Sequence, residues 1–294
     1  MMLRSTLRRV ARSVARRLPW LRAVSGRFGL GRALAPAGSH EILMLDGDIK
    51  FELDLSVPIF RFMYFNYDAA NQPEPTLIGA LMNRTRVFVD VGALIGEIGL
   101  IGAKYAARAY LFEPNPRSFA RLQRNLALNP SLAVRITARP IAIAESAGMR
   151  TLFAPEASPG ISSFHAMAKQ VDSNEVQTET LDSAIPAADV VGFLKIDVEG
   201  AELDVLAGAE RVITHDRPWV HIELVENNQK AFGRTCDDIV AWMDARGFDG
   251  FEINGDRRMP RLSPVAARSR GPADIANVLF APRERLAELD RWRA

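Results

Sequence analysis

The sequence of 294 residues contains a single cysteine, Cys236, and no apolar run long enough to span a membrane. A lone cysteine excludes an internal disulfide framework and any thiolate metal cluster, so nothing in the fold depends on an oxidising compartment. A spanning helix would need about 20 consecutive, mostly apolar residues. With 48% apolar residues, the chain can nevertheless bury a sizeable core. We therefore expect a cytoplasmic protein with one large domain and appended segments.

Acidic residues are missing from the first 40 positions, which hold nine arginines and no lysine. The first carboxylate is Glu41, and the chain from there on carries 28 basic against 35 acidic side chains. A mildly acidic body argues against a nucleic-acid groove, because such grooves need an excess of positive charge. We therefore expect no nucleic-acid partner.

The arginine-rich segment of residues 1–40 has helical periodicity. From Leu3 to Leu21, apolar residues recur every three or four positions with arginines between them, which predicts a basic amphipathic helix. Such a helix could make peripheral contact with an anionic membrane through residues 3–21, dock on a partner, or lie solvated at the terminus. Its composition also resembles an organelle transit peptide. The sequence leaves these alternatives open.

Residues 41–84 predict a small hairpin followed by a helical lead-in. The alternating runs 42–45 and 49–55 flank Asp46-Gly47-Asp48, a turn signal, and a helix is expected near residues 76–83. We expect the main domain to occupy residues 85–284 and a short tail to occupy residues 285–294.

Within the main domain, short apolar strands alternate with amphipathic helices. Strands are expected at 87–91, 109–112, 134–137, 149–153, 192–198 and 219–225, with helices at 96–106, 116–128 and 201–206. This alternation predicts an α/β fold with a mostly parallel, Rossmann-like sheet covered by helices on both faces. Thr235 is the expected N-cap of a later helix. Residues 248–253 and 277–281 then follow with no helix between them, which predicts a terminal antiparallel pair.

The loop from Asp90 to Gly96 follows the first strand of this pattern. In an open parallel sheet, ligands bind beyond the carboxyl ends of the strands. Gly92 and Gly96 allow a ligand to approach the backbone closely, and Asp90 offers an acceptor for a cationic amine. Glu113 ends the second strand, from which a carboxylate can accept both hydroxyls of an adenosine ribose.

The spacing of the glycines argues against a nicotinamide dinucleotide at this loop. A G-x-G-x-x-G pattern that starts at Gly92 would need glycine where the chain has Leu94 and Glu97. An oxidoreductase is therefore disfavoured.

Two further strands end in ionisable side chains. Asp197 and Glu199 leave one strand at alternate positions, and His221 and Glu223 occupy alternate positions on the next. We expect Asp197, His221 and Glu223 to be catalytic, with Asp197 as the first choice of base. Structural alternatives are that Asp197 and Glu199 cap the following helix and that His221 is a hydrogen-bonded strand residue. A magnesium ion held by these four residues is a further alternative, which we do not favour.

Ser162, Ser163 and His165 lie in a segment between predicted elements. We expect Ser162 and Ser163, together with Glu199, to contact the substrate, and His165 is an additional candidate base. The alternative is an ordinary surface loop.

Taken together, several strings resemble the FkbM-type methyltransferases, a branch of the class I S-adenosylmethionine-dependent enzymes. The strings are VFVDVGALIGEIGL, LFEPNPRSFARLQRNLALN, GISSF, TLDS, LKIDVEGAELDVLAGAE, HIEL and NVLFAP, within residues 45–282. The resemblance implies a seven-stranded sheet with a reversed final strand, a class I methyltransferase domain over residues 85–284, and S-adenosylmethionine as cofactor. It also implies O-methylation of a saccharide or other small-molecule acceptor.

The resemblance implies a set of cofactor contacts around the strand ends. These are Asp90, Gly92, Ala93, Gly96, Glu113, Pro114, Asn115, Ala142 and Asp197. Leu94 departs from the family pattern, because the family loop commonly has asparagine there, which offers a polar contact to the methionine end of the cofactor. We expect weaker cofactor binding as a result. The alternative function is a catalytically weak, membrane-associated binding module built on the same fold.

Overall fold

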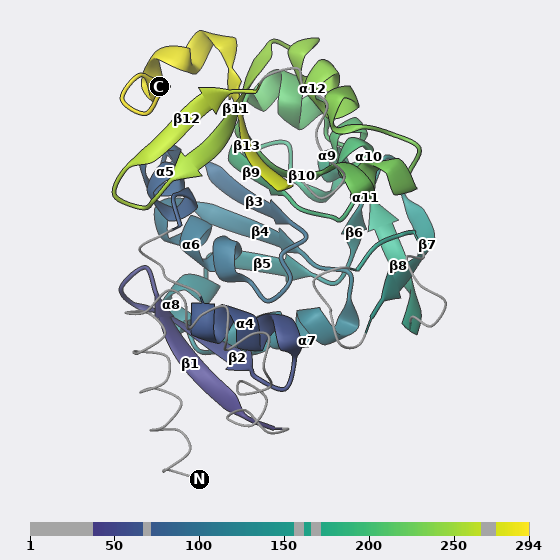
Figure 1. The fold of residues 1–294 in the computed structure, drawn as a ribbon. Coiled ribbons are helices and arrows are strands. Elements are labelled where there is room, and N and C mark those ends of the chain that lie inside the picture. Colours follow the sequence, from purple (N-terminus) through teal and green to yellow (C-terminus); the bar gives the residue numbers. More distant parts are fainter. Residues whose placement is uncertain (1–37, 67–71, 156–161, 166–171, 266–274, 294) are drawn as a thin grey trace. The chain divides into compact units, whose positions relative to one another are not determined.

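A computed structural model describes residues 38–66, 72–155, 162–165, 172–265 and 275–293 (Figure 1). The amphipathic helix predicted for residues 3–21 lies outside these ranges. The chain divides into two compact units, residues 1–69 and residues 70–294. Across the described ranges, every helix is too short or too polar to cross a bilayer.

The first unit contains the predicted hairpin. Strands β1 (His40–Leu45) and β2 (Ile49–Asp54) pair antiparallel across the expected turn. Asp46 and Gly47 in that turn have positive φ angles of 44° and 88°, a left-handed backbone that aspartate and glycine tolerate better than other residues. The hairpin is therefore confirmed, and helix α4 (Pro58–Asn66) follows it.

The second unit is built on a large twisted sheet. Its strands are β3 (Val87–Val91), β4 (Arg108–Phe112), β5 (Ile136–Arg139), β9 (Val191–Ile196), β10 (Trp219–Val225), β11 (Phe248–Gly255), β12 (Pro260–Pro264) and β13 (Ile275–Pro282). Among the described residues, the order across the sheet is β12-β11-β13-β10-β9-β3-β4-β5.

The direction of the strands confirms the predicted Rossmann-like arrangement with a reversed strand. Neighbouring strands from β5 to β10 pair in parallel, whereas β13 is antiparallel to both β10 and β11. The structure adds one edge strand to the seven expected, because β12 pairs antiparallel with β11.

The central strands are buried at every position, which is usual for parallel strands covered on both faces. On one face, Val89 of β3 and Leu194 of β9 pack in a core with side chains of α10 (Glu202–Ala207) and α12 (Cys236–Asp244). Figure 1 shows these two helices on the same side of the sheet.

Helix α6 (Glu97–Tyr105) packs very closely against the other face of the sheet. A Cβ atom on Gly102 would lie 2.3 Å from a ring carbon of Phe88 on β3. The close approach therefore depends on the missing side chain. The remaining helices of this unit are α5 (Glu74–Leu81), α7 (Pro116–Ala127), α8 (Pro130–Ala133), α9 (Leu181–Ala184) and α11 (Glu226–Ala231), with a π-helical turn at Val212–Asp216 and a 3-10 segment at Arg283–Leu289.

A separate small sheet has the order β6-β8-β7 among the described residues. Its strands are β6 (Ala142–Ile143), β7 (Gly148–Ala154) and β8 (Asp172–Glu179). The predicted strand at residues 149–153 exists, but it belongs to this sheet and not to the main one. Strand β8 was not predicted from the sequence, because this strand is mostly polar and buries only Val176 and Thr178.

The predicted N-cap of α12 is a full capping box. Thr235 accepts a hydrogen bond from the backbone N–H of Asp238, and the Asp238 carboxylate accepts one from the backbone N–H of Thr235. We expect Thr235→Ala to lower the free energy of unfolding by about 1 kcal/mol, because it removes one of these bonds. Urea denaturation measures the change, and Thr235→Ser serves as the control that keeps the hydroxyl. A Thr235→Ala variant as stable as the parent would contradict this account.

Candidate active site

A pocket lies at the carboxyl ends of β3, β4 and β9. It is lined by Gly92 and Leu94 from the loop after β3, by Glu113 and Pro114 from the end of β4, and by Asp197 and Glu199 from the segment after β9. Apolar side chains near β6 and β7, among them Ile141 and Leu152, complete its wall. Ligands bind at this edge in open parallel sheets.

The loop between β3 and α6 is held very close to the segment after β9. Gly92 has a φ of +82°, and a Cβ atom there would lie 1.8 Å from the carbonyl oxygen of Asp197. The backbone N–H groups of Gly92 and Ala93 both donate to the carbonyl of Phe112, at 3.0 Å. Only glycine fits at position 92, so the residue type decides how near the two walls of the pocket come.

Glu113 ends β4 as predicted and lines the pocket while being 5% exposed. Its carboxylate accepts hydrogen bonds of 2.8 Å from the backbone N–H groups of Leu94 and Asn115. Burial raises the pKa of Glu113 to about 8, and the two backbone N–H groups oppose that shift. The side chain is thus fixed between two loops at the pocket wall.

Lys195 lies at the centre of the polar groups, and the sequence analysis did not select it. Its ammonium group is 3.2 Å from the Gly92 carbonyl oxygen, 3.2 Å from the Asp197 carboxylate and 3.4 Å from the Asp90 carboxylate. Burial lowers the pKa of Lys195, but the charges of Asp197 and Asp90 outweigh it, so the net direction is upward. The sequence feature that could have identified Lys195 is a single charged residue inside the otherwise apolar strand VGFLKI.

Strand register places Lys195 between Asp90 on β3 and His221 on β10. His221 is 5% exposed, and its Nε2 lies 3.1 Å from Oδ1 of Asn277 on β13. Burial, followed by the charge of Lys195, lowers the pKa of His221 to about 4. The imidazole is therefore neutral near pH 7 and hydrogen-bonded within the sheet, and it is not part of the pocket lining.

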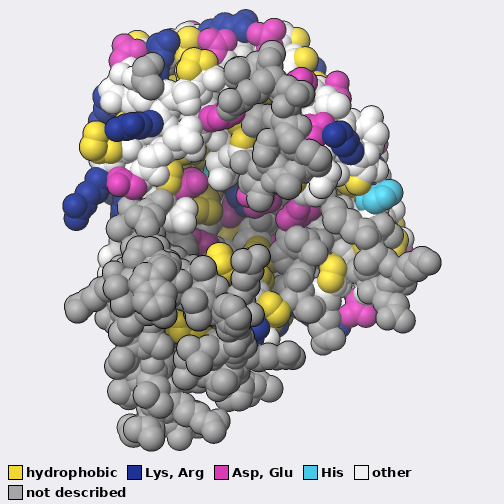
Figure 2. All heavy atoms as spheres, viewed as in Figure 1, with side chains coloured by type: hydrophobic (Ala, Val, Ile, Leu, Met, Phe, Trp, Pro, Cys, Tyr) yellow, Lys and Arg dark blue, Asp and Glu magenta, His cyan; other side chains and the backbone are white. Residues whose placement is uncertain are grey.

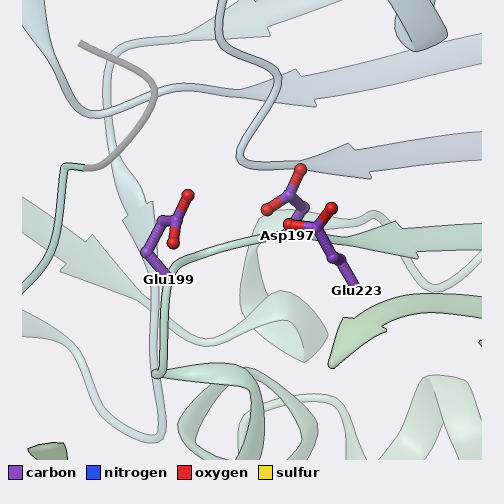
Figure 3. A group of neighbouring side chains, drawn as sticks. All are labelled: Asp197, Glu199 and Glu223. Carbon is purple, nitrogen blue, oxygen red and sulfur yellow. The ribbon is translucent and has the colours of Figure 1, made fainter. Parts of the chain in front are cut away.

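Three carboxylates converge beside the pocket. Ligand atoms of Asp197, Glu199 and Glu223 lie within 4.8 Å of one another (Figure 3). Burial, and then the charge of Asp197, raises the pKa of Glu199 to about 8 and that of Glu223 to about 7. On the face shown in Figure 2, acidic side chains gather near the middle of the view. Carboxylates with such pKa values can accept a proton near neutral pH.

The same oxygens have the chemistry of ligands for a hard divalent cation. His221, the fourth ligand weighed in the sequence analysis, is bonded to Asn277 and does not join the group of Asp197, Glu199 and Glu223.

Glu202 caps the turn that leads into α10, the role that the sequence analysis considered for Asp197 and Glu199. It accepts hydrogen bonds from the backbone N–H groups of Val198, at 3.3 Å, and Gly200, at 3.2 Å. Asp197 binds Lys195 instead, and Glu199 accepts a 2.5 Å hydrogen bond from the Asn228 amide. Both acids are therefore directed toward polar side chains of the site.

Ser162 and Ser163, the predicted substrate contacts, both line the pocket. The Asn115 amide donates to the Ser162 hydroxyl at 2.9 Å, and the Ser163 hydroxyl donates to the Glu199 carbonyl at 2.9 Å. Backbone hydrogen bonds of 2.9 Å in both directions join Ser163 to Phe153 of β7. The small sheet thereby positions these serines at the pocket.

The predicted cofactor contacts occupy two kinds of position. Gly92, Glu113, Pro114, Ala142 and Asp197 line the pocket. The others do not line the pocket. Asp90 is buried next to Gly99 of α6, and Gly96 is the N-cap of that helix. Asn115 caps α7, because its side chain accepts a hydrogen bond from the backbone N–H of Arg117 at 3.0 Å. Ala93 is buried and joins its loop to Phe112.

Leu94 and Glu199 line the pocket with left-handed backbone angles, φ +50° and +56°. This conformation costs a non-glycine residue about 1–2 kcal/mol, and asparagine tolerates it better than leucine does. Strain of this kind concentrates at functional sites.

Comparison with known proteins gives consistent matches. The methyltransferase FkbM domain matches residues 90–249. "Methyltransferase 1" of Beauveria bassiana (strain ARSEF 2860) is 31% identical over 184 residues, which are 55% of this chain and 66% of that protein. "Methyltransferase sdnD" of Sordaria araneosa is 30% identical over 238 residues, 69% of this chain and 85% of that protein.

Among solved structures, the crystal structure of methyltransferase FkbM from Methylobacillus flagellatus KT matches with 20% identity and a TM-score of 0.47. The match covers 77% of this chain and 52% of that chain. The chain thus spans about half the length of that crystallised protein and just under two thirds of the first relative.

The buried ammonium group of Lys195 should make a large contribution to stability. We expect Lys195→Met to lower the free energy of unfolding by about 3–5 kcal/mol, because it leaves the buried Asp90 carboxylate without its cation. Urea denaturation measures the loss, and adding Asp90→Asn should restore part of it. Lys230→Met is the control, because its ion pair with Glu226 has an exposed ammonium and should contribute less than about 1 kcal/mol. Equal losses in the two single variants would refute the role of Lys195.

The raised pKa of Glu199 makes its contribution to stability depend on pH. Its pKa is about 8 in the folded protein against an ordinary value of 4.5, so the folded state binds more protons between these values. This contribution favours folding at low pH and is lost as the pH rises through about 8. We expect Glu199→Gln to raise Tm relative to the parent by an amount that grows from acidic to mildly alkaline pH. Thermal denaturation across this range measures it, with the exposed Glu175→Gln as control. A constant Tm difference would contradict the prediction.

Proposed function

Because the chain belongs to the FkbM methyltransferase family, we propose that it transfers a methyl group from S-adenosylmethionine to a hydroxyl oxygen of a saccharide or other small-molecule acceptor. The observation that carries the proposal is the composition of one pocket. Glu113 on the β4 side and the acids Asp197 and Glu199 on the β9 side line the same cavity at the strand ends.

The pocket residues fit the proposed cofactor. Phe112, Ile141 and Ala142 offer apolar surface for an adenine ring, and Glu113 offers a carboxylate for ribose hydroxyls. Because Gly92 has no side chain, a ligand in the pocket can approach the backbone of the loop closely. When bound, S-adenosylmethionine supplies an electrophilic methyl group on a sulfonium.

The protein's own contribution is to position the acceptor and to take its proton. Lys195 holds the Asp197 carboxylate at 3.2 Å, which places this side chain to orient the acceptor hydroxyl. Glu199 has a pKa of about 8 and accepts a hydrogen bond from Asn228, so its deprotonated form is basic enough to take the acceptor proton, and this form predominates only above about pH 8. Correct alignment of the two reacting atoms supplies much of the remaining rate enhancement.

Two variants separate cofactor binding from catalysis. We expect Glu113→Gln to weaken S-adenosylmethionine binding about tenfold, because the amide offers one oxygen acceptor for hydrogen bonds where the carboxyl group has two oxygens. We expect Glu199→Gln to keep the affinity within about twofold of the parent and to lower turnover about 10²–10⁴-fold, the usual contribution of a general base. Calorimetry measures the affinity, and transfer of labelled methyl groups to a panel of saccharides and small alcohols measures turnover.

Several outcomes would overturn parts of the proposal. If calorimetry detects no heat of binding at millimolar S-adenosylmethionine, the proposed methyl transfer is refuted. The alternative function, a binding module that Leu94 favours, would then remain. Methyl groups found on nitrogen or carbon would refute O-methylation. Activity lost in excess EDTA and restored by magnesium would assign the three carboxylates to a metal site.

A further inference from the structure

A second groove in residues 70–294 is lined by arginine and aromatic side chains. It lies between α5, the end of α6, the turn joining β11 to β12 and the C-terminal segment, and it encloses about 410 Å³. Its lining includes Thr76, Tyr105, Arg257, Arg258, Arg291 and Trp292. None of its lining residues belongs to the pocket of Glu113, so the two cavities are distinct among the described residues.

Hydrogen bonds between segments far apart in the sequence hold the walls of this groove. The Thr76 hydroxyl donates to the Arg257 carbonyl at 2.7 Å, which fixes the β11–β12 turn next to α5. The backbone N–H of Leu262 donates to the Trp292 carbonyl at 2.8 Å, which fixes the C-terminal segment along β12. Figure 1 shows α5 beside β12. The walls of the groove are therefore held in place by hydrogen bonds of the fold itself.

Close packing places Tyr105 against α5. A Cβ atom on Gly79 would lie 3.0 Å from the tyrosine ring, so the missing side chain makes room for the ring. Pro75 and Pro260 add further apolar surface to the lining. The groove thus combines an apolar wall with cationic groups.

Two of the three arginines that line the groove have no carboxylate partner among the described residues. Arg258 and Arg291 are exposed, and no carboxylate of the described residues forms an ion pair with either guanidinium. The guanidinium of Arg291 lies over the Trp292 ring, 3.9 Å from its centroid, which limits its motion.

The acids closest in sequence do not form an ion pair with either guanidinium. Asp256 accepts hydrogen bonds from the backbone N–H groups of Arg258, at 2.8 Å, and Met259, at 2.9 Å. Asp290 pairs with Arg293 at 3.3 Å.

We propose that this groove binds the phosphate group of a small organic molecule. Guanidinium groups match phosphate oxygens in a bidentate geometry and keep their charge at all physiological pH values. Arg258 and Arg291 form no ion pair within the described residues, and a phosphate monoester carries about −1.5 to −2 at pH 7, against −1 for a carboxylate, so a phosphate matches these two charges better. Tyr105 and the two prolines suit the organic part of such a ligand. This inference does not rest on the proposed methyltransferase chemistry.

Calorimetry on the full chain tests the proposal, with glucose 1-phosphate, inorganic phosphate and glucose as probes. We expect glucose 1-phosphate to bind, inorganic phosphate to bind more weakly and glucose not to bind. The double variant Arg258→Ala/Arg291→Ala should weaken glucose 1-phosphate binding at least about tenfold, since two charge-assisted contacts are lost. Binding of S-adenosylmethionine should be unchanged, which separates this result from any failure of the proposed function.

A matched control variant removes two arginines that lie outside the groove. Arg124 and Arg135 are exposed and do not line the groove, so Arg124→Ala/Arg135→Ala should leave glucose 1-phosphate binding within about twofold of the parent. Trp292 lies in the groove, so a change in tryptophan fluorescence on binding gives a second readout that the groove variant should lose.

Three results would overturn the proposal. The first is that the parent protein binds neither phosphate probe. The second is equal weakening in the groove variant and in the control, which would indicate nonspecific charge attraction. The third is binding to phosphatidylcholine vesicles that contain phosphatidate, lost in the groove variant, with no binding of the soluble phosphates; that result would assign the groove to lipid headgroups.

Discussion

The buried ammonium group of Lys195 is the constraint on which the arrangement of the active site depends. It contacts groups from three segments, namely Asp90 on β3, the Gly92 carbonyl in the loop before α6 and Asp197 after β9. A cation inside a protein must be paired, because removing it from water costs several kcal/mol. The segments that carry its partners are therefore fixed relative to one another. This requirement holds the two walls of the pocket at the separation that glycine at position 92 permits.

Beside this cation lie more carboxyl groups than its single charge can pair with. Asp197, Glu199 and Glu223 lie close together, and burial with mutual repulsion raises the pKa values of both glutamates toward neutrality. Left-handed backbone at Leu94 and Glu199 adds local strain to the same pocket. Both features lower stability, and both are typical of sites at which charge or proton position changes during a reaction.

The pocket at the strand ends and the groove beside α5 differ in charge. The charged residues that line the pocket are the acids Glu113, Asp197 and Glu199, whereas arginines and aromatic rings line the groove. The hydroxyl acceptor that we propose suits the pocket, and the phosphate that we propose suits the groove.

The sequence alone determined the alternation of strands and helices, the hairpin turn at Asp46 and Gly47, the capping box at Thr235 and the position of Glu113 at the end of β4. These features arise from neighbours along the chain, through periodicity, turn conformation and hydrogen bonds over a few residues. Tertiary structure alone decided that Lys195 bridges two acids, that Glu202 caps its turn in place of Asp197 and Glu199, that β6, β7 and β8 form a second sheet, and that three arginines share a groove. Such contacts join segments that can be about a hundred residues apart, and they depend on strand register, which the packing of the whole sheet sets and no local pattern encodes.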